Sequence, residues 1–389
     1  MNSKQLQNYS IKYTIGEGGF AQVFFAIHKA TGVEVAIKVI PKHENNEDGL
    51  QIARIQREIE ILKMIKHPFI TDLFEVIENE NYYFLVLEYV SNGTLLNNIN
   101  ERGPFKESDA AIIFAQLVLV LRHLQTNFNI AHRDIKAENI LIDSNLNIRV
   151  IDFGLSFITP VGTKMHRQCG SPAYASPELI LGKEYTSSAD IWSAGVVLFA
   201  MITGYLPFQD HNITKLAQKI VYQDIELPPH ISPALKDLLI RLLTKDNHLR
   251  ITLEEIMNHP WVKTQIKIIQ NKINEFKYDY SDISNSLSQL GYDMEEINKD
   301  IQMGKTNDGT ITYSMLLRNY LNHNFKPAID CYPLKQSRKG SYHEIDLFPR
   351  MVLKDFLQPI KRSSLPQQPT NVSLIKKRHC QSPVVYIQN

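Results

Sequence analysis

The chain has 389 residues and a formal net charge of +1 at pH 7, with 43% hydrophobic and 21% charged residues. These values are ordinary for a globular protein that buries a large core, and the near-zero charge gives no general reason to expect nucleic acid or membrane binding. A length of this order suggests about two or three domains.

The spacing of the cysteines and the length of the apolar runs indicate in which cellular compartment the protein is expected. Cys169, Cys331 and Cys380 lie far apart without a C-x-x-C pair, which argues against a disulfide framework or a zinc site and fits a reducing compartment. Residues 1–10 are polar, so no signal peptide is visible, and the longest apolar run, 110–121, is too short to span a bilayer. We therefore expect a soluble cytoplasmic protein, with the nucleus as an alternative.

Residues 13–40 alternate short β-rich runs with turns, and a glycine-rich stretch, 16–20, opens between two of them. Small residues there let backbone N–H groups approach phosphates closely, although a hairpin without a ligand would explain the stretch equally well. A strand-like run then ends in Val-Ala-Ile-Lys with a single cation, Lys38. Alone, such a lysine is most often a solvated surface charge.

The next segment offers a partner for Lys38. A helix expected over residues 51–65 carries Glu58 and Glu60, which point about 200° apart at ~100° per residue. Only one of them can face Lys38, and the other belongs on a solvated face. His67-Pro68 ends this helix, and two strands follow, the second at 83–89.

The run 110–124 is apolar on almost every side, which predicts a buried helix. After it comes the stretch His-Arg-Asp-Ile-Lys-Ala-Glu-Asn at 132–139, and Asp152-Phe153-Gly154 follows. Together these supply a proton acceptor, a cation and two oxygen ligands for a metal, the groups that phosphoryl transfer from a nucleotide to a hydroxyl requires. Each residue alone could be a solvated loop charge, but their order and spacing argue against chance.

These two stretches resemble the catalytic and metal-binding loops of protein kinases, H-R-D-x-K-x-x-N and D-F-G. The resemblance implies an α+β, two-lobed kinase fold over residues 13–261, with a β-rich N-lobe and a helical C-lobe. It also implies that Asp134 accepts the substrate hydroxyl proton and that Lys136 stabilises the transferring phosphoryl group. Asn139 and Asp152 would hold Mg²⁺.

ATP is the cofactor that this resemblance implies. Lys38 would hold the α- and β-phosphates, with Glu58 as its partner because Arg57-Glu58-Ile59 resembles the kinase helix pattern. The backbone of Glu88 and Val90 would meet the adenine, with Leu87 behind as gatekeeper. Further nucleotide contacts are expected from Gly16, Glu17, Gly18, Gly19, Phe20, Ala21, Val23, Ala36 and Leu141. Ala21 departs from the kinase pattern, which has a third glycine there.

Residues of the large lobe refine the resemblance. Ser171, together with Lys136, resembles the serine/threonine-specific class. Thr94 and Ala200 stand where kinases of basic sites often carry acids, which puts a preference for upstream arginine in doubt. In a later helix Asp190 is expected to bond the backbone around His132. A buried ion pair is expected between Arg250 and Glu178.

The activation segment carries another departure. Arg167 occupies the position where relatives of AMP-activated protein kinase have a phosphorylatable threonine. The alternatives are phosphorylation of Thr163, loss of activation control, or ordering of the segment without phosphorylation. We favour the last.

Beyond the kinase motifs, residues 282–321 carry three short helix-like segments that resemble the ubiquitin-associated (UBA-like) domain of AMP-activated and microtubule-affinity-regulating kinases. A helical unit of ~40 residues is marginal alone, so we expect it to pack on the kinase domain and tune it. Ubiquitin binding and a helical spacer are the alternatives. Residues 326–389 hold 11 Lys/Arg and 4 Asp/Glu, 11 − 4 = +7, and are expected to form a disordered regulatory tail, with contact to a membrane surface as the lesser alternative.

The sequence therefore predicts a protein serine/threonine kinase that transfers the γ-phosphoryl group of Mg-ATP to protein substrates. An ATP-binding pseudokinase scaffold is one alternative; its mark would be a missing Lys38, Asp134, Asn139 or Asp152, and all four are present. A ubiquitin-binding adaptor acting through residues 282–321 is the other. Nucleic acid is not an expected partner.

Overall fold

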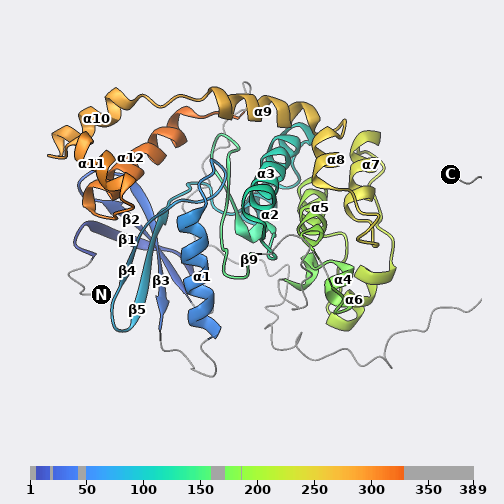
Figure 1. The fold of residues 1–389 in the computed structure, drawn as a ribbon. Helices are drawn as coiled ribbons and strands as arrows, with labels where there is room; N and C mark the ends of the chain where they lie inside the picture. Colours follow the sequence, from blue (N-terminus) through green and yellow to red (C-terminus); the bar gives the residue numbers. More distant parts are fainter. Residues whose placement is uncertain (1–5, 18–20, 43–49, 159–170, 185, 328–389) are drawn as a thin grey trace, which may run out of the picture. The chain divides into compact units, whose positions relative to one another are not determined.

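Five antiparallel strands form the first sheet of the structure, in the order β1-β2-β3-β5-β4 (Figure 1). The computed structural model describes residues 6–17, 21–42, 50–158, 171–184 and 186–327, all within one unit of the chain, Met1–Pro349. The strands are β1 (Tyr9–Glu17), β2 (Gln22–His28), β3 (Glu34–Pro41), β4 (Leu73–Glu78) and β5 (Tyr82–Glu88). The sheet thus begins at Tyr9, earlier than the expected residue 13.

The two faces of this sheet are both buried, because successive side chains of a strand point to opposite sides. In β3, Val35, Ile37 and Val39 join the core cluster on one face. Ile40 joins the cluster on the other face, together with residues of helix α1 (Leu50–Met64). Lys38 alternates with the first set, so β3 carries its side chain on the α1 face.

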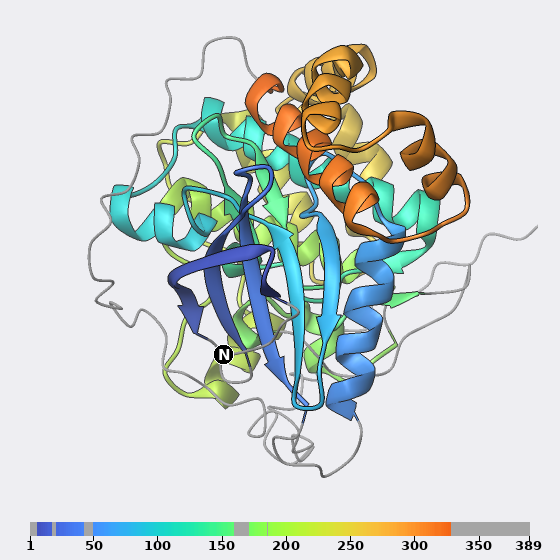
Figure 2. The same cartoon turned by 90° about the vertical axis from the view of Figure 1, so that its left-hand side faces the viewer.

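Helix α12 (Asp308–Asn324) belongs to the far end of the chain but covers the face of the sheet opposite α1. Ile311 and Met315 of α12 are buried in the same cluster as Phe84 and Val86 of β5. Figure 2 shows the blue strands with α1 beside them and the orange α12 at their upper end. The sheet is therefore packed between an early helix and a late one.

A helical lobe follows the sheet, and it contains two short antiparallel strand pairs, β6 with β9 and β7 with β8. The long helix α3 (Glu107–Phe128) lies against α5 (Ser188–Thr203) and α9 (Lys263–Glu275). The other helices are α2 (Leu95–Arg102), α4 (Pro177–Ile180), α6 (Ile213–Tyr222), α7 (Pro233–Leu242), α8 (Leu253–Asn258), α10 (Tyr280–Gln289) and α11 (Met294–Gln302), and the short strands are β6 (Ile130–Ala131), β7 (Ile140–Ile142), β8 (Ile148–Val150) and β9 (Phe157–Ile158). This mixture confirms the predicted α+β fold with a β-rich and a helical lobe.

Helix α3 is longer than the apolar run 110–121 suggested. It has 22 residues and is, among the described helices, the one that is long and apolar enough to cross a bilayer by length and composition. Of its most apolar window, 67% is buried inside the protein. Packing in the core therefore accounts for its composition.

Two predicted contacts of the helical lobe are confirmed. The Arg250 guanidinium donates to both carboxylate oxygens of Glu178, at 2.6 and 2.9 Å, and both residues are buried. Asp190, also buried, accepts the backbone N–H groups of His132 and Arg133 at 2.8 Å each. A buried carboxylate is tolerated in the core only when such partners compensate its lost hydration.

The region of the expected UBA-like domain contains three helices, α10, α11 and α12. Ile283, Leu287 and Ile297 form a small buried cluster of their own between these helices. Gly291, at φ +85°, makes the turn after α10 that Leu-Gly-Tyr signals in the sequence. Nearly all of the expected tail, residues 328–389, lies outside the described residues.

Candidate active site

Lys38 and Glu58 form an ion pair between the sheet and α1. Their Nζ and Oε1 atoms lie 2.7 Å apart, and Glu58 is buried. The alternative partner, Glu60, is exposed, as its position on the helix predicted. Burial alone would lower the pKa of Lys38, but the carboxylates of Glu58 and Asp152 raise it above its usual value. Lys38 therefore stays protonated, with its positive charge near the carboxylates of Glu58 and Asp152.

The backbone of the two motif loops is held in an uncommon conformation. Arg133 has φ +67° and Asp152 has φ +64°, in the left-handed region that residues other than glycine rarely adopt. Asp190 fixes the loop at Arg133 through the hydrogen bonds described above, and the His132 and Phe153 rings lie 4.7 Å apart. Strain of this kind persists only where the surroundings impose it, and it is typical of functional sites.

Three polar side chains converge on Asp134. Its Oδ2 atom lies 2.8 Å from Lys136 Nζ and accepts Asn139 Nδ2 at 2.9 Å. Lys136 Nζ also donates to Ser171 Oγ at 2.9 Å, and the Ser171 backbone N–H donates to Asp134 Oδ1 at 3.2 Å. A buried carboxylate, a cation and a serine of the later segment thus share one small site.

The residue types at the expected metal site fit Mg²⁺. Asn139 uses its NH₂ group on Asp134, which leaves its carbonyl oxygen for a ligand. Burial opposes ionisation of Asp152, but Lys38 and the Gly154 N–H hold its pKa below the usual value, so the carboxylate is charged. Among the described residues no group of three or more His, Cys, Asp or Glu could hold a metal. Two oxygen ligands plus nucleotide phosphates are the set that Mg²⁺ uses in kinases.

The segment after β5 joins the sheet to the helical lobe. Val90 is buried, and Leu141 of β7 forms an isolated bridge with Thr94. The Thr94 hydroxyl accepts the backbone N–H of Asn97 and so caps α2. Thr94 therefore has a structural role at the position where an acid was expected in kinases of basic sites.

Some expected site residues cannot be placed. Gly18, Gly19 and Phe20 of the glycine-rich stretch, and Thr163 and Arg167 of the activation segment, lie outside the described residues. The flanking Gly16 and Val23 are paired across β1 and β2. Ala36 lies in β3 on the same face as Lys38.

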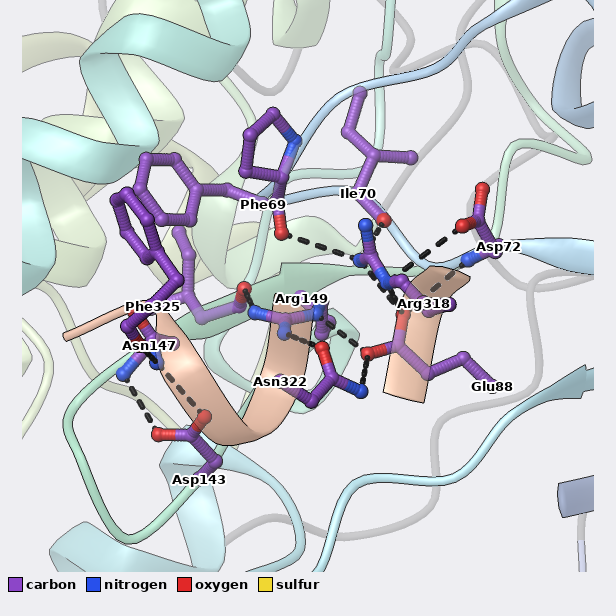
Figure 3. Close-up of polar contacts among 12 residues, drawn as sticks. Phe69, Ile70, Asp72, Glu88, Asp143, Asn147, Arg149, Arg318, Asn322 and Phe325 are labelled. Atoms are coloured by element: carbon purple, nitrogen blue, oxygen red, sulfur yellow. Dashed lines mark hydrogen bonds and ion pairs between the residues drawn. The ribbon is translucent and has the colours of Figure 1, made fainter. Parts of the chain in front are cut away.

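A buried ionic cluster around Glu88 was missed in the sequence (Figure 3). Glu88 accepts Arg149 Nε at 2.7 Å, Arg318 Nε at 2.8 Å and Asn322 Nδ2 at 2.8 Å. Arg318 also donates to the carbonyl oxygens of Ile70, Pro68 and His67, at 2.7, 3.1 and 3.3 Å. The available signal was a single charge next to apolar residues: Ile-Arg-Val in β8 and Leu-Leu-Arg in α12.

This cluster ties three distant parts of the chain together. Glu88 ends β5, Arg149 lies in β8 of the helical lobe, and Arg318 belongs to α12. Burial opposes ionisation of Glu88, but the two guanidinium groups hold its pKa below the usual value. Arg318 and Asn322 of α12 thereby bond to the side chain of Glu88, the residue whose backbone was expected to meet the adenine.

Comparison with known proteins places these features in a family. The protein kinase domain family matches residues 9–262. The SNF1-related protein kinase catalytic subunit alpha KIN12 of Arabidopsis thaliana is 38% identical over 319 residues, 81% of this chain and 64% of that protein. Serine/threonine protein kinase OSK4 of Oryza sativa subsp. japonica is 36% identical over 324 residues, 82% of this chain and 63% of that protein.

A third relative matches over fewer residues. The probable serine/threonine-protein kinase MARK-A of Dictyostelium discoideum is 42% identical over 264 residues, 67% of this chain and 25% of that protein. The chain thus spans less than two thirds of the length of these relatives.

Proposed function

This chain belongs to the protein kinase family, and from that premise we propose that it transfers the γ-phosphoryl group of Mg-ATP to serine or threonine hydroxyls of protein substrates. One observation carries the proposal: Asp134, Lys136, Asn139 and Ser171 share a site within hydrogen-bonding distances. In the same structure, Lys38 forms its ion pair with Glu58. A pseudokinase scaffold would not need this complete set.

Each residue has a distinct role in the proposed reaction. Asp134 accepts the proton of the substrate hydroxyl, and Lys136 neutralises charge beside it. Lys38, held by Glu58, positions the phosphates. Asn139 and Asp152 would hold Mg²⁺, which when bound neutralises charge on the phosphates. The kinase family uses ATP and Mg²⁺ in general, and the assignment to these residues is the proposal.

The direct test uses the full chain, purified and incubated with Mg-ATP and peptides that offer Ser, Thr or Tyr as acceptors. We expect phosphate on Ser and Thr peptides and none on Tyr peptides. Omission of Mg²⁺ is expected to abolish incorporation. A chain that binds ATP but phosphorylates no acceptor, itself included, would support the scaffold reading instead.

We also propose that the α10–α12 segment (residues 280–324) stabilises the assembled active site from within the same chain. Its helix α12 covers the sheet through Ile311 and Met315 and reaches Glu88 through Arg318. With α12 in this position, the Lys38–Glu58 pair is formed. This arrangement supports an intramolecular role over ubiquitin capture as the main role of the segment.

Arg318→Met tests this proposal. Removing one partner of a buried ion pair costs about 3–5 kcal/mol, because the remaining polar groups lose their compensation. We therefore expect faster hydrogen exchange in residues 67–72 and in α12, and lower kinase activity. The measurement is hydrogen exchange by mass spectrometry alongside a peptide assay.

Lys305→Met is the matched control. Lys305 lies in the same segment and pairs with Asp300 at 2.8 Å, but its side chain is 56% exposed. Its partner Asp300 keeps the hydrogen bond that Asn307 Nδ2 donates at 2.7 Å, and a pair with one partner in solvent contributes only about 0–1 kcal/mol, so little change is expected. Higher kinase activity in Arg318→Met than in the unaltered chain would show that the α10–α12 segment inhibits the active site. Unchanged hydrogen exchange would show that Arg318 does not hold α12 against the sheet.

A further inference from the structure

Three aromatic side chains form a continuous row between the first strands of the sheet and the segment after β5. The rings of Tyr13 in β1 and Phe25 in β2 are stacked, with centroids 5.0 Å apart and an interplanar angle of 24°. The Phe25 ring meets the Tyr89 ring edge to face, with centroids 4.7 Å apart and an angle of 63°. Tyr89 lies between Glu88 and Val90, the two residues whose backbone is expected to meet the adenine.

The register of the sheet explains how Phe25 reaches Tyr89. Ala36 of β3 lies opposite Phe25 on one side and opposite Leu87 of β5 on the other. Directly opposite side chains share a face, so all three lie on the face of the sheet that carries Lys38. Because the side chain of Ala36 is a single methyl group, it leaves room over β3 for a large ring at position 25 to extend toward Tyr89.

The row links two parts of the sheet that are not neighbours in the strand order β1-β2-β3-β5-β4. Strand β3 lies between β2 and β5, so the backbone pairing of β1 and β2 does not reach β5. Gly16 and Val23, expected nucleotide contacts, are paired with each other across β1 and β2. The other expected contacts, at residues 88–90, lie at and just after the end of β5. The row therefore connects the two sides between which a nucleotide base is expected.

Burial shows that the row is a packed contact. Phe25, in the middle, is 7% exposed, Tyr89 is half-buried, and Tyr13, at the outer end, is 42% exposed. Stacked and edge-to-face rings stabilise a contact beyond the area that they bury. Aromatic side chains also lose little conformational entropy when they are held, because they have only two rotatable torsions. The rings can therefore fix β1 and β2 relative to residues 88–90 before a nucleotide binds, and such preorganisation raises affinity.

We propose that Tyr13, Phe25 and Tyr89 are positioning residues for the base of an adenine nucleotide. They hold β1 and β2 at the separation from residues 88–90 that the base requires. The inference rests on the proposed kinase function and adds to it three side chains outside the expected set of nucleotide contacts. Their effect is on binding of the base, whereas Lys38 and Asp134 act on the phosphates and on the proton of the substrate.

The experiment measures the Kd of adenosine and of Mg-ADP for the full chain by calorimetry, with kcat and KM for ATP in the peptide assay. Phe25→Leu removes the ring shared by both contacts and keeps a large apolar side chain. We expect both Kd values and KM to rise by about 3–10-fold, the size of effect that aromatic pairs have. Because adenosine has no phosphates, an equal rise for both ligands places the effect at the base. At saturating ATP, kcat should stay within about two-fold, as expected when uniform binding is lost.

Two variants of Tyr13 test the row without altering the core. Tyr13→Leu removes the outer ring, so both Kd values should rise by about two-fold. Tyr13→Phe keeps the ring and should retain the values of the unaltered chain. Tyr82→Leu is the matched control: Tyr82 is also 42% exposed and its ring lies 6.1 Å from that of Phe84, but it is at the other end of β5. We expect it to leave both Kd values unchanged.

The outcomes separate the row from the kinase function. Unchanged Kd values in Phe25→Leu and Tyr13→Leu, or weaker binding of Mg-ADP but not of adenosine, would overturn the row and leave the kinase function standing. If Phe25→Leu does not fold, the comparison of Tyr13→Leu with Tyr13→Phe decides alone. An unaltered chain that binds both ligands but phosphorylates no peptide would overturn the kinase function, and the Kd values would still decide on the row. An unaltered chain that binds neither ligand would overturn both.

Discussion

Asp134→Asn is expected to reduce kcat by about 10²–10⁴-fold, the range that a positioned general base contributes. Asparagine has the shape of aspartate and can still accept the N–H of Ser171 through an oxygen, so the fold should remain. What it cannot do is take the proton of the substrate hydroxyl. It also removes the charge that faces Lys136 Nζ at 2.8 Å.

A peptide phosphorylation assay with a parallel thermal unfolding measurement checks this expectation. Asp143→Asn provides the matched control, because Asp143 accepts backbone N–H groups of Asn145 and Asn147 in a turn and lies outside the catalytic set. We expect the control to retain activity and Asp134→Asn to retain Tm. A kcat for Asp134→Asn within a few-fold of the unaltered chain would show that another group accepts the proton.

Lys38→Met is expected to lower kcat/KM by about 10²–10³-fold, the usual effect of removing one group that stabilises developing charge. Lys38 lies between Glu58 and Asp152, and both carboxylates hold it protonated. Its loss leaves the buried Glu58 without a cation, which would also loosen α1. The lost cation no longer stabilises charge on the phosphates, and the loosened α1 no longer holds the site in its assembled form. We therefore expect kcat to fall even where nucleotide still binds.

Lys42→Met separates this effect from a general loss of positive charge. Lys42 follows the same strand and pairs with Glu78 at 2.6 Å, but the Glu78 side chain is 56% exposed. We expect the control to change activity by less than about two-fold, because Lys42 lies outside the catalytic set and a pair with one partner in solvent contributes about 0–1 kcal/mol. Nucleotide titration measured with kcat completes the test. Equal activity of Lys38→Met and Lys42→Met would remove Lys38 from the proposed mechanism.

The kinase core could be predicted because its groups lie in short stretches with fixed spacing. In residues 132–139 and 152–154 the spacing along the chain largely determines how close the side chains lie. The ion pair of Arg250 with Glu178 was predicted from the resemblance to kinases. Helical periodicity showed only that one of Glu58 and Glu60 can face Lys38. The choice of Glu58 came from the resemblance of Arg57-Glu58-Ile59 to the kinase helix pattern, and the exposure of Glu60 agrees with it. Sequence spacing was therefore enough to predict which side chains meet wherever they lie within a few residues of one another.

The cluster around Glu88 could not be predicted in the same way. Glu88, Arg149 and Arg318 have no fixed spacing, and Glu88 and Arg318 are separated by 230 positions. Either arginine alone could have been a surface charge on a strand or helix.

The cover that α12 gives to the sheet has a consequence for how the protein is made. Phe84 and Val86 pack with Ile311 and Met315, yet the ribosome synthesises the strand more than two hundred residues before the helix. During that interval an aromatic and β-branched surface of the nascent chain has no partner, and such surfaces recruit chaperones or aggregate. Helix α12, the last in the described part of the chain, therefore completes a part of the molecule that was among the first to be translated.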